Sequence, residues 1–130
     1  MVQKGQKILI SDDSAFMGLI IKKVLGENGY WDTIDAVSGR EAIDMFEQHK
    51  PDLVLLDIIM PGIDGLGALK ALMKIDKKAK VIMITAVGQE EIMKECRKVG
   101  AVGYIVKPFK ERQIVNTIKK IIGPGKKRKK

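Results

Sequence analysis

The sequence predicts an α/β fold: a doubly wound, five-stranded parallel sheet with helices on both faces. Two features of the 130-residue chain predict it, namely short segments that are apolar at almost every position and helical segments that alternate with them. A strand that is apolar on both sides belongs in a parallel sheet covered by helices. When each strand is followed by a helix and the crossovers are right-handed, the sheet is doubly wound.

The predicted strands are of two kinds. Four segments are nearly continuously apolar, so we expect strands that are buried on both faces. A fifth segment, Trp31 to Ala36, carries Asp32 and Asp35, and this polarity predicts an edge strand. The four apolar segments are Ile8 to Ile10, Leu53 to Leu56, Val81 to Ile84, and Tyr104 to Val106.

Between the strands, apolar residues recur with the spacing of one face of a helix. Ser38, with Glu41 three residues later, gives the second helix a capping box, and Gly29 stands where the first requires a left-handed C-cap. The fourth helix has only a narrow apolar stripe among charges, so we expect it to be the least firmly anchored. The five stripes are Phe16, Ile20, Ile21, Val24 and Leu25; Ala42, Ile43 and Phe46; Leu66, Leu69, Leu72 and Met73; Ile92, Met93, Cys96 and Val99; and Ile114, Val115, Ile118, Ile121 and Ile122.

The composition indicates one globular domain, which we place at residues 1–123, followed by a basic, disordered tail at 124–130. The net charge is +8, but Lys126 to Lys130 are all basic, so the rest of the chain is only mildly basic. A nucleic-acid-binding face is therefore not indicated. The single cysteine, Cys96, excludes a disulfide framework and a multi-cysteine metal site. No segment resembles a membrane span or a signal peptide, and we expect a soluble cytoplasmic protein.

Side chains capable of chemistry follow four of the predicted strands: Asp12 and Asp13, then Asp57, Thr85 and Lys107. Ligands bind beyond the carboxyl ends of strands in an open parallel sheet, so we expect these residues to converge. Crowded carboxylates repel one another unless a cation lies among them, and oxygen ligands suit Mg²⁺. The set predicts phosphoryl transfer, with Asp57 as nucleophile, Lys107 balancing charge and Thr85 donating a hydrogen bond to a phosphoryl oxygen.

These residues resemble the receiver domain of two-component response regulators, in order and in spacing, from about Lys7 to Ile122. Within this family the chain resembles the stand-alone, CheY-like chemotaxis regulators, because it shows no output domain and because Ser14-Ala15-Phe16-Met17 is similar to the same segment in chemotaxis-type receivers. The resemblance implies a flavodoxin-like (βα)5 fold with strand order 2-1-3-4-5. The matching motifs are Asp12-Asp13, Asp57 with Met60-Pro61 and Gly65, Thr85-Ala86, and Lys107-Pro108-Phe109.

The resemblance implies a phosphorylation-controlled switch more than an enzyme. Asp57 would accept a phosphoryl group from a CheA-like sensor histidine kinase. Asp13 and Asp57 would hold Mg²⁺ directly, and Asp12 would act largely through water. The backbone carbonyl of Ile59 occupies the position of the family's third protein ligand to the metal.

The resemblance also implies how the signal leaves the site. Tyr104 matches an aromatic switch position whose ring turns inward when Thr85 moves toward the phosphoryl group. The fourth helix, fifth strand and fifth helix would then bind a downstream motility or signalling protein, as a monomer or a weak phosphorylation-dependent dimer. Ile59 and Val87 stand where family members often carry polar side chains that influence the hydrolytic water. Since neither can hydrogen-bond water, we hypothesise a comparatively long-lived acyl phosphate on Asp57.

Several other interpretations stay open at this point. Asp12 and Asp13 alone are also typical of a helix N-cap and first turn. A Mg²⁺-dependent phosphatase with an aspartyl nucleophile would favour two aspartates with one residue between them. A flavin-binding module needs hydroxyl and glycine donors after the first strand, where this chain has two carboxylates. The basic run Lys126 to Lys130 could bind nucleic acid. Two further alternatives are a receiver in a phosphorelay other than chemotaxis and a degenerate receiver that acts by binding alone.

Overall fold

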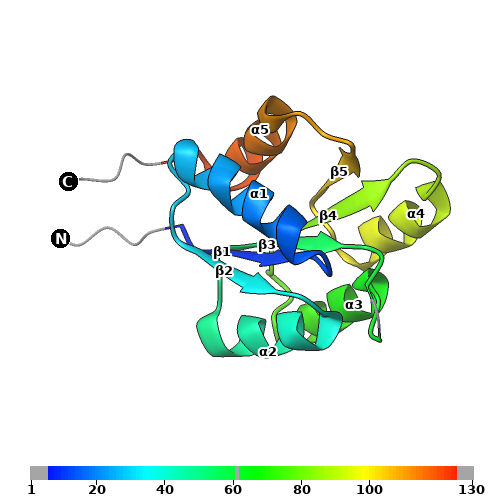
Figure 1. Cartoon of the computed structure of the whole chain (residues 1–130). Coiled ribbons are helices and arrows are strands. Elements are labelled where there is room, and N and C mark those ends of the chain that lie inside the picture. Colours follow the sequence, from blue (N-terminus) through cyan, green and yellow to red (C-terminus); the bar gives the residue numbers. More distant parts are fainter. Residues whose placement is uncertain (1–5, 61, 126–130) are drawn as a thin grey trace.

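The computed structural model describes residues 6–60 and 62–125. Five parallel strands form one sheet in the order β2-β1-β3-β4-β5, which confirms the predicted architecture and strand order (Figure 1). Their carboxyl ends meet at one edge of the sheet, because all of the strands run in the same direction. The strands are β1 (Ile8–Ser11), β2 (Thr33–Ala36), β3 (Leu53–Asp57), β4 (Val81–Ala86) and β5 (Gly103–Lys107).

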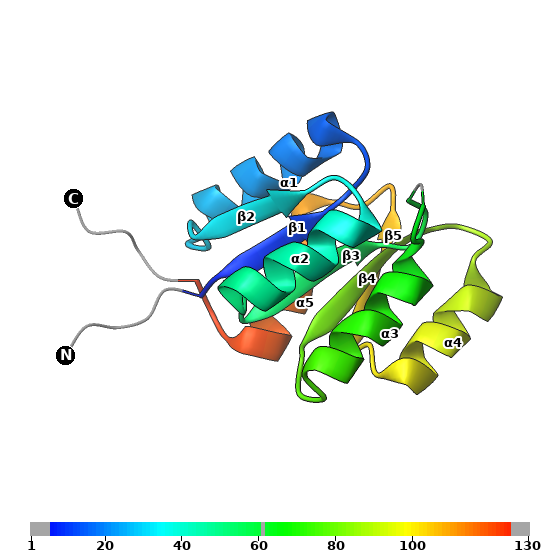
Figure 2. The same ribbon diagram turned by 90° about the horizontal axis from the view of Figure 1, so that it is seen from below.

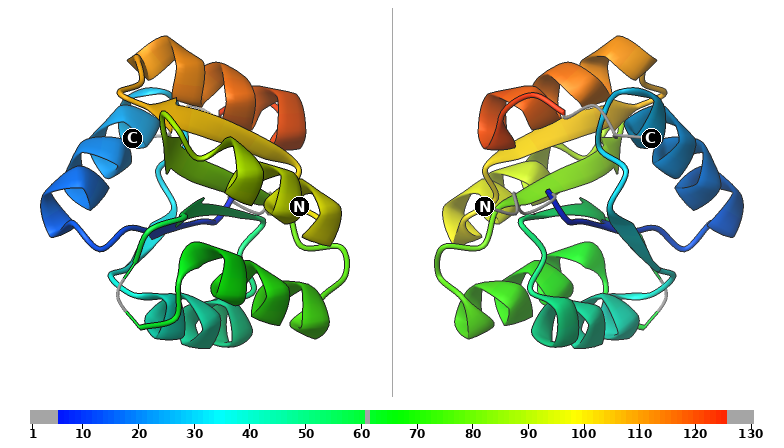
Figure 3. Two further views of the ribbon diagram at one scale, coloured as in Figure 1. Left: turned by 90° about the vertical axis from the view of Figure 1, so that its right-hand side faces the viewer. Right: turned by 90° about the vertical axis from the view of Figure 1, so that its left-hand side faces the viewer.

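The helices cover both faces of the sheet, α1 and α5 on one and α2, α3 and α4 on the other (Figures 2 and 3). Successive side chains of a strand point to opposite faces. In β3, Leu53 and Leu55 therefore pack under α1 and α5, while Val54 and Leu56 pack under the other three helices. The helices are α1 (Ala15–Glu27), α2 (Gly39–His49), α3 (Gly65–Ile75), α4 (Glu90–Val99) and α5 (Glu111–Ile122).

The predicted burial of the last strand is wrong. β5 is an edge strand, as β2 is at the other side, and only Ile105 in its centre is buried. Tyr104 is 47% exposed and Val106 39%, because α4 leaves a cavity above them instead of packing on them. The predicted edge position of β2 is confirmed, although the strand begins at Thr33 and not at Trp31.

The apolar stripe predicted for α1 is correct at Ile21, Val24 and Leu25 but wrong at Phe16, which is 71% exposed, and at Ile20. Each residue turns the helix by about 100°, so the positions directly before Met17 and Ile21 face away from the sheet. Met17 instead packs against the core of this face. The outer side of α1 consequently presents apolar surface to solvent.

The predicted helix caps are present with one change. The Ser38 hydroxyl accepts a hydrogen bond from the Glu41 backbone N–H at 3.1 Å. The Glu41 carboxylate accepts from the backbone of Val37, one residue earlier than a standard capping box has it. Gly29 has a φ of 90°, as expected after α1.

The two ends of the described chain lie together, at the edge of the sheet opposite the carboxyl ends of the strands (Figure 1). The Gln6 side chain donates to the carbonyl of Ile122, and the Tyr30 hydroxyl donates to the carbonyl of Gly123 at 2.7 Å. Lys126 to Lys130, the basic part of the predicted tail, lie outside the described residues. Among the described residues, none of the helices has both the length and the apolar character that a membrane span requires.

Candidate functional site

Three aspartates meet where β1 and β3 end. Asp12 and Asp13 directly follow β1, and Asp57 is the last residue of β3. The two strands are neighbours with Ser11 opposite Leu56, which places Asp12 beside Asp57. One carboxylate oxygen of each aspartate lies within 4.8 Å of the others. The structure thus brings together the carboxylates that the sequence predicted to converge.

The carboxylates of this cluster do not cap the following helix. Ser14 is the N-cap of α1, and its hydroxyl accepts from the backbone N–H of Met17 at 3.2 Å. Asp12 supports this turn from outside the helix, since its Oδ1 accepts from the backbone N–H of Ser14 at 2.9 Å. The interpretation of Asp12 and Asp13 as helix-capping residues alone is therefore wrong.

Lys107 supplies the positive charge of the site from the end of β5. Its Nζ lies 3.1 Å from Asp57 Oδ2 and 3.3 Å from Asp12 Oδ2, so it bridges two nearly buried carboxylates. Burial raises the pKa of Asp57, although the hydrogen bond and charge of Lys107 oppose this shift. Burial would lower the pKa of Lys107, but the hydrogen bonds and charges of Asp57 and Asp12 together outweigh it and the pKa is raised. The ammonium group is therefore held in its charged form.

One ammonium does not balance three carboxylates, and a cation is the group that would. The donors in this cluster are all oxygens, which suits Mg²⁺, an ion that keeps several water ligands and takes one or two carboxylates. Asp12 and Asp57 are buried while Asp13 is exposed, so the cluster is open to solvent on one side. The residues present thus fit a hydrated Mg²⁺ ion.

The loop after β3 folds back tightly over the end of the strand. The Ile59 backbone N–H donates to Asp57 Oδ1 at 3.1 Å, and the Gly65 N–H donates to the carbonyl of Ile58 at 2.8 Å. A side chain on Gly65 would overlap the backbone oxygen of Asp57, so α3 can begin here only with glycine. The Ser11 hydroxyl also contacts the Met60 sulfur at 3.4 Å. The sequence contained no signal for that contact.

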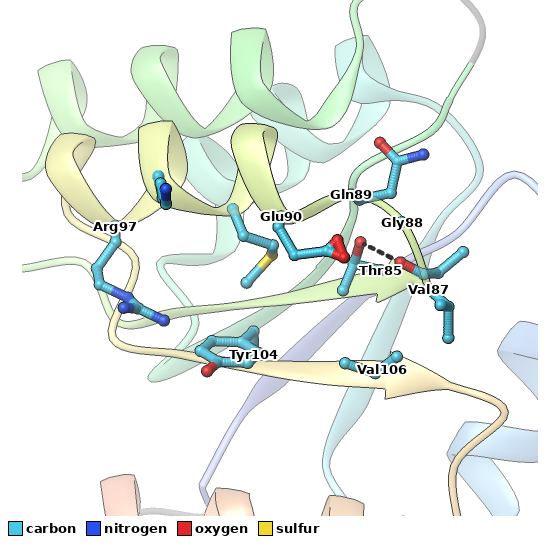
Figure 4. Close-up of a pocket in the computed structure, with 11 residues that line it drawn as sticks. Thr85, Val87, Gly88, Gln89, Glu90, Arg97, Tyr104 and Val106 are labelled. Atoms are coloured by element: carbon cyan, nitrogen blue, oxygen red, sulfur yellow. Dashed lines mark hydrogen bonds between the residues drawn. The ribbon is translucent and has the colours of Figure 1, made fainter.

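Thr85 lies near the end of β4 and is 3% exposed. Its hydroxyl donates to the carbonyl of Ala86 at 3.2 Å and not to a carboxylate of the cluster. Thr85 also lines a cavity of about 370 Å³ beneath α4 (Figure 4). This residue therefore belongs both to the carboxyl edge of the sheet and to the cavity.

Tyr104 lies across the same cavity from Thr85 (Figure 4). The guanidinium carbon of Arg97 lies 5.1 Å from the centre of its ring. Arg97 carries no signal in the sequence, because the contact depends on how α4 packs beside β5. Val87 lines the cavity too and, like Ile59, is largely exposed.

Comparison with known proteins gives a consistent result. The family model of the response regulator receiver domain matches residues 8–119. The chemotaxis protein CheY of Thermotoga maritima is 41% identical over 117 residues, which cover 90% of this chain and 98% of that protein. Sporulation initiation phosphotransferase F of Bacillus subtilis is 37% identical over 118 residues, 91% of this chain and 94% of that protein.

The solved structures agree with this pattern. A chain of the CheX-CheY-BeF3-Mg+2 complex from Borrelia burgdorferi matches with a TM-score of 0.83 and 36% sequence identity. The match covers 88% of this chain and 87% of that chain. Both the sequence and the backbone thus align over nearly their whole length with chemotaxis proteins, and the sequence also aligns with a sporulation phosphotransferase.

Proposed function

The chain belongs to the response regulator receiver domain family and resembles its CheY-like members, and we propose that Asp57 is its phosphoacceptor. The protein is a signalling switch in which a histidine kinase supplies the phosphoryl group. The observation that carries the proposal is the position of Asp57, which lies at a strand end among two further carboxylates and 3.1 Å from the Lys107 ammonium.

The phosphoryl transfer uses the residues around Asp57 in distinct roles. A carboxylate oxygen of Asp57 forms a bond to phosphorus while the bond from phosphorus to the donor's imidazole nitrogen breaks, and the imidazole takes up a proton. Lys107 is placed to balance charge on the phosphoryl oxygens. Thr85 donates a hydrogen bond to the same group once its hydroxyl turns away from Ala86. Water later cleaves the acyl phosphate and regenerates the Asp57 carboxylate.

The proposed metal site uses all three carboxylates of the cluster, Asp12, Asp13 and Asp57. Asp13 and Asp57 would be direct ligands of a bound Mg²⁺ ion, together with the backbone carbonyl of Ile59. Both oxygens of Asp12 already accept hydrogen bonds, from Lys107 and from the Ser14 backbone, which supports a role through water. An ion held by these residues would supply positive charge to neutralise the phosphoryl oxygens.

The output of the switch lies on the α4-β5-α5 surface. Phosphorylation moves Thr85 toward Asp57. This movement enlarges the cavity that Thr85 lines, and the Tyr104 ring then turns into it. The 370 Å³ cavity between the two residues supports this coupling. A chemotaxis or motility partner is favoured by the relatives named as chemotaxis proteins, with another phosphorelay as the second candidate because a sporulation phosphotransferase is also similar.

Acetyl phosphate, Mg²⁺ and intact-mass measurement test this function, with Asp57→Asn as the control. We expect one phosphoryl adduct that requires Mg²⁺, disappears with a chelator and is absent from the control. Steady release of phosphate without an adduct would favour a Mg²⁺-dependent phosphatase. A protein that shows neither signal would be a degenerate receiver, and the proposed chemistry would be wrong.

A further inference from the structure

The Tyr104 ring stands between two cavities. The cavity of about 370 Å³ extends from the ring to Thr85, between α4 and β4 (Figure 4). A second cavity of about 220 Å³ lies on the side of Gly103. Met93, Arg97 and Tyr104 line both cavities. A space of 370 Å³ accommodates small ligands, which is more than a phenol ring requires, so packing alone does not hold the ring outside.

Arg97 makes the contact that holds the ring outward. A guanidinium group within about 6 Å of a ring centre is attracted by the negative face of the aromatic system, and here the separation is 5.1 Å. Glu90 and Lys94 of α4 also line the large cavity, yet Arg97 forms no ion pair with any described residue. The ring is therefore the partner that the guanidinium has in this conformation.

We propose that Arg97 is a positioning residue that keeps Tyr104 outside the cavity and so lowers the fraction of unphosphorylated protein in the active state. The proposal rests on the proposed function, because it assigns a regulator to the same switch. Inward rotation of the ring breaks the Arg97 contact, and the contact therefore favours one of the two states. A contact that differs between two states shifts their populations by its own free energy.

The expected size follows from the exposure of the pair. Tyr104 is about half exposed, and an exposed cation–π contact changes a population ratio by about two- to fivefold. Arg97→Ala should raise the ratio of inward to outward ring by this factor. The same factor should appear in the affinity of the site for a phosphoryl mimic, since ring position and Thr85 position are linked.

Fluorine NMR of the full chain labelled with 3-fluorotyrosine measures the ring directly. The chain has two tyrosines, and Tyr30→Phe assigns the signals. In the unphosphorylated protein, Arg97→Ala should move the Tyr104 resonance toward its position in the beryllofluoride-bound protein. Arg97→Lys, which keeps a cation, should move it less. Lys98→Ala removes the same charge from the adjacent position of α4 and should leave it unchanged.

Titration with beryllofluoride and Mg²⁺ gives the second measurement. Arg97→Ala should tighten binding about two- to fivefold, the factor expected for an exposed cation–π pair, and should have no effect in a Tyr104→Ala background. An unshifted Tyr104 resonance, an equal shift from Lys98→Ala, or an undiminished effect without Tyr104 would overturn the role of Arg97. If wild-type protein bound no beryllofluoride, the phosphoacceptor proposal would fail, while an unshifted Tyr104 resonance in the Arg97→Ala protein, or an equal shift from Lys98→Ala, would still overturn the role of Arg97.

Discussion

Replacement of Gly65 by alanine tests the link between the packing of the β3-α3 loop and the proposed phosphoacceptor, Asp57. A Cβ at Gly65 would lie 2.5 Å from the Cα of Ile58 and would overlap the carbonyl oxygen of Asp57. Ordinary van der Waals contact begins at 3.4 Å, so the loop and strand must separate by about 1 Å. Because the opposing atoms belong to the backbone, no side-chain rotation relieves the overlap.

The free energy of unfolding should fall by about 0.5–2 kcal/mol. Overpacking of this kind destabilises by about 1–3 kcal/mol, and the preference of a helix for alanine over glycine offsets about 0.5–1 kcal/mol of it. The rate of Asp57 phosphorylation should also fall, by up to about 100-fold, because a shift of about 1 Å misplaces the reacting group.

Urea denaturation and mass-monitored phosphorylation by acetyl phosphate measure the two effects. Gly18→Ala in α1 is the matched control, since its Cβ would meet no atom within 4 Å. This variant should be more stable than the wild type by about 0.5–1 kcal/mol. A Gly65→Ala protein with wild-type stability and phosphorylation rate would refute the steric argument.

Two further predictions concern the opposite end of the sheet and the lifetime of the phosphorylated state. Burial raises the pKa of Tyr30 above its ordinary 10.0, so its contribution to stability is present below pH 10 and is lost at higher pH. Tyr30→Phe removes the hydrogen bond to Gly123 and should lower the free energy of unfolding by about 0.5–1.5 kcal/mol near neutral pH. The variant should also lose less stability than the wild type as the pH rises above 10. Denaturation curves recorded at several pH values measure both effects, and an equal alkaline loss of stability in the two proteins would contradict the prediction. Ile59→Asn combined with Val87→Glu should speed loss of the phosphoryl group from Asp57 by about five- to tenfold, which is the effect of one added hydrogen bond to the attacking water. If the adduct mass decayed at the wild-type rate, these two side chains would not determine the lifetime of the acyl phosphate.

Local pattern was sufficient for the architecture and for the carboxylate cluster. The end of an apolar segment marks the end of a strand, and the carboxyl ends of parallel strands share one edge of the sheet. Asp12, Asp57 and Lys107 could therefore be placed together from their positions in the chain. Their meeting within hydrogen-bond distance also requires the strand order β2-β1-β3-β4-β5, which the resemblance to receiver domains implied and which alternation of strands and helices does not specify.

Features that depend on which surfaces touch could not be read from the chain. The segment from Tyr104 to Val106 is apolar enough for an interior strand, yet it lies at an edge where α4 leaves a cavity. Phe16 has the spacing of the α1 stripe, but the rotation of the helix about its axis turns it to solvent.

The residue sequence alone thus determined the order of the elements and the edge at which the charged residues gather, because these follow from local periodicity and chain direction. Only the tertiary structure decided where the Thr85 hydroxyl points, which glycine the end of β3 requires, and that Arg97 stacks on Tyr104. Each of these depends on how closely successive segments approach one another, and that approach is set by how the side chains around them pack.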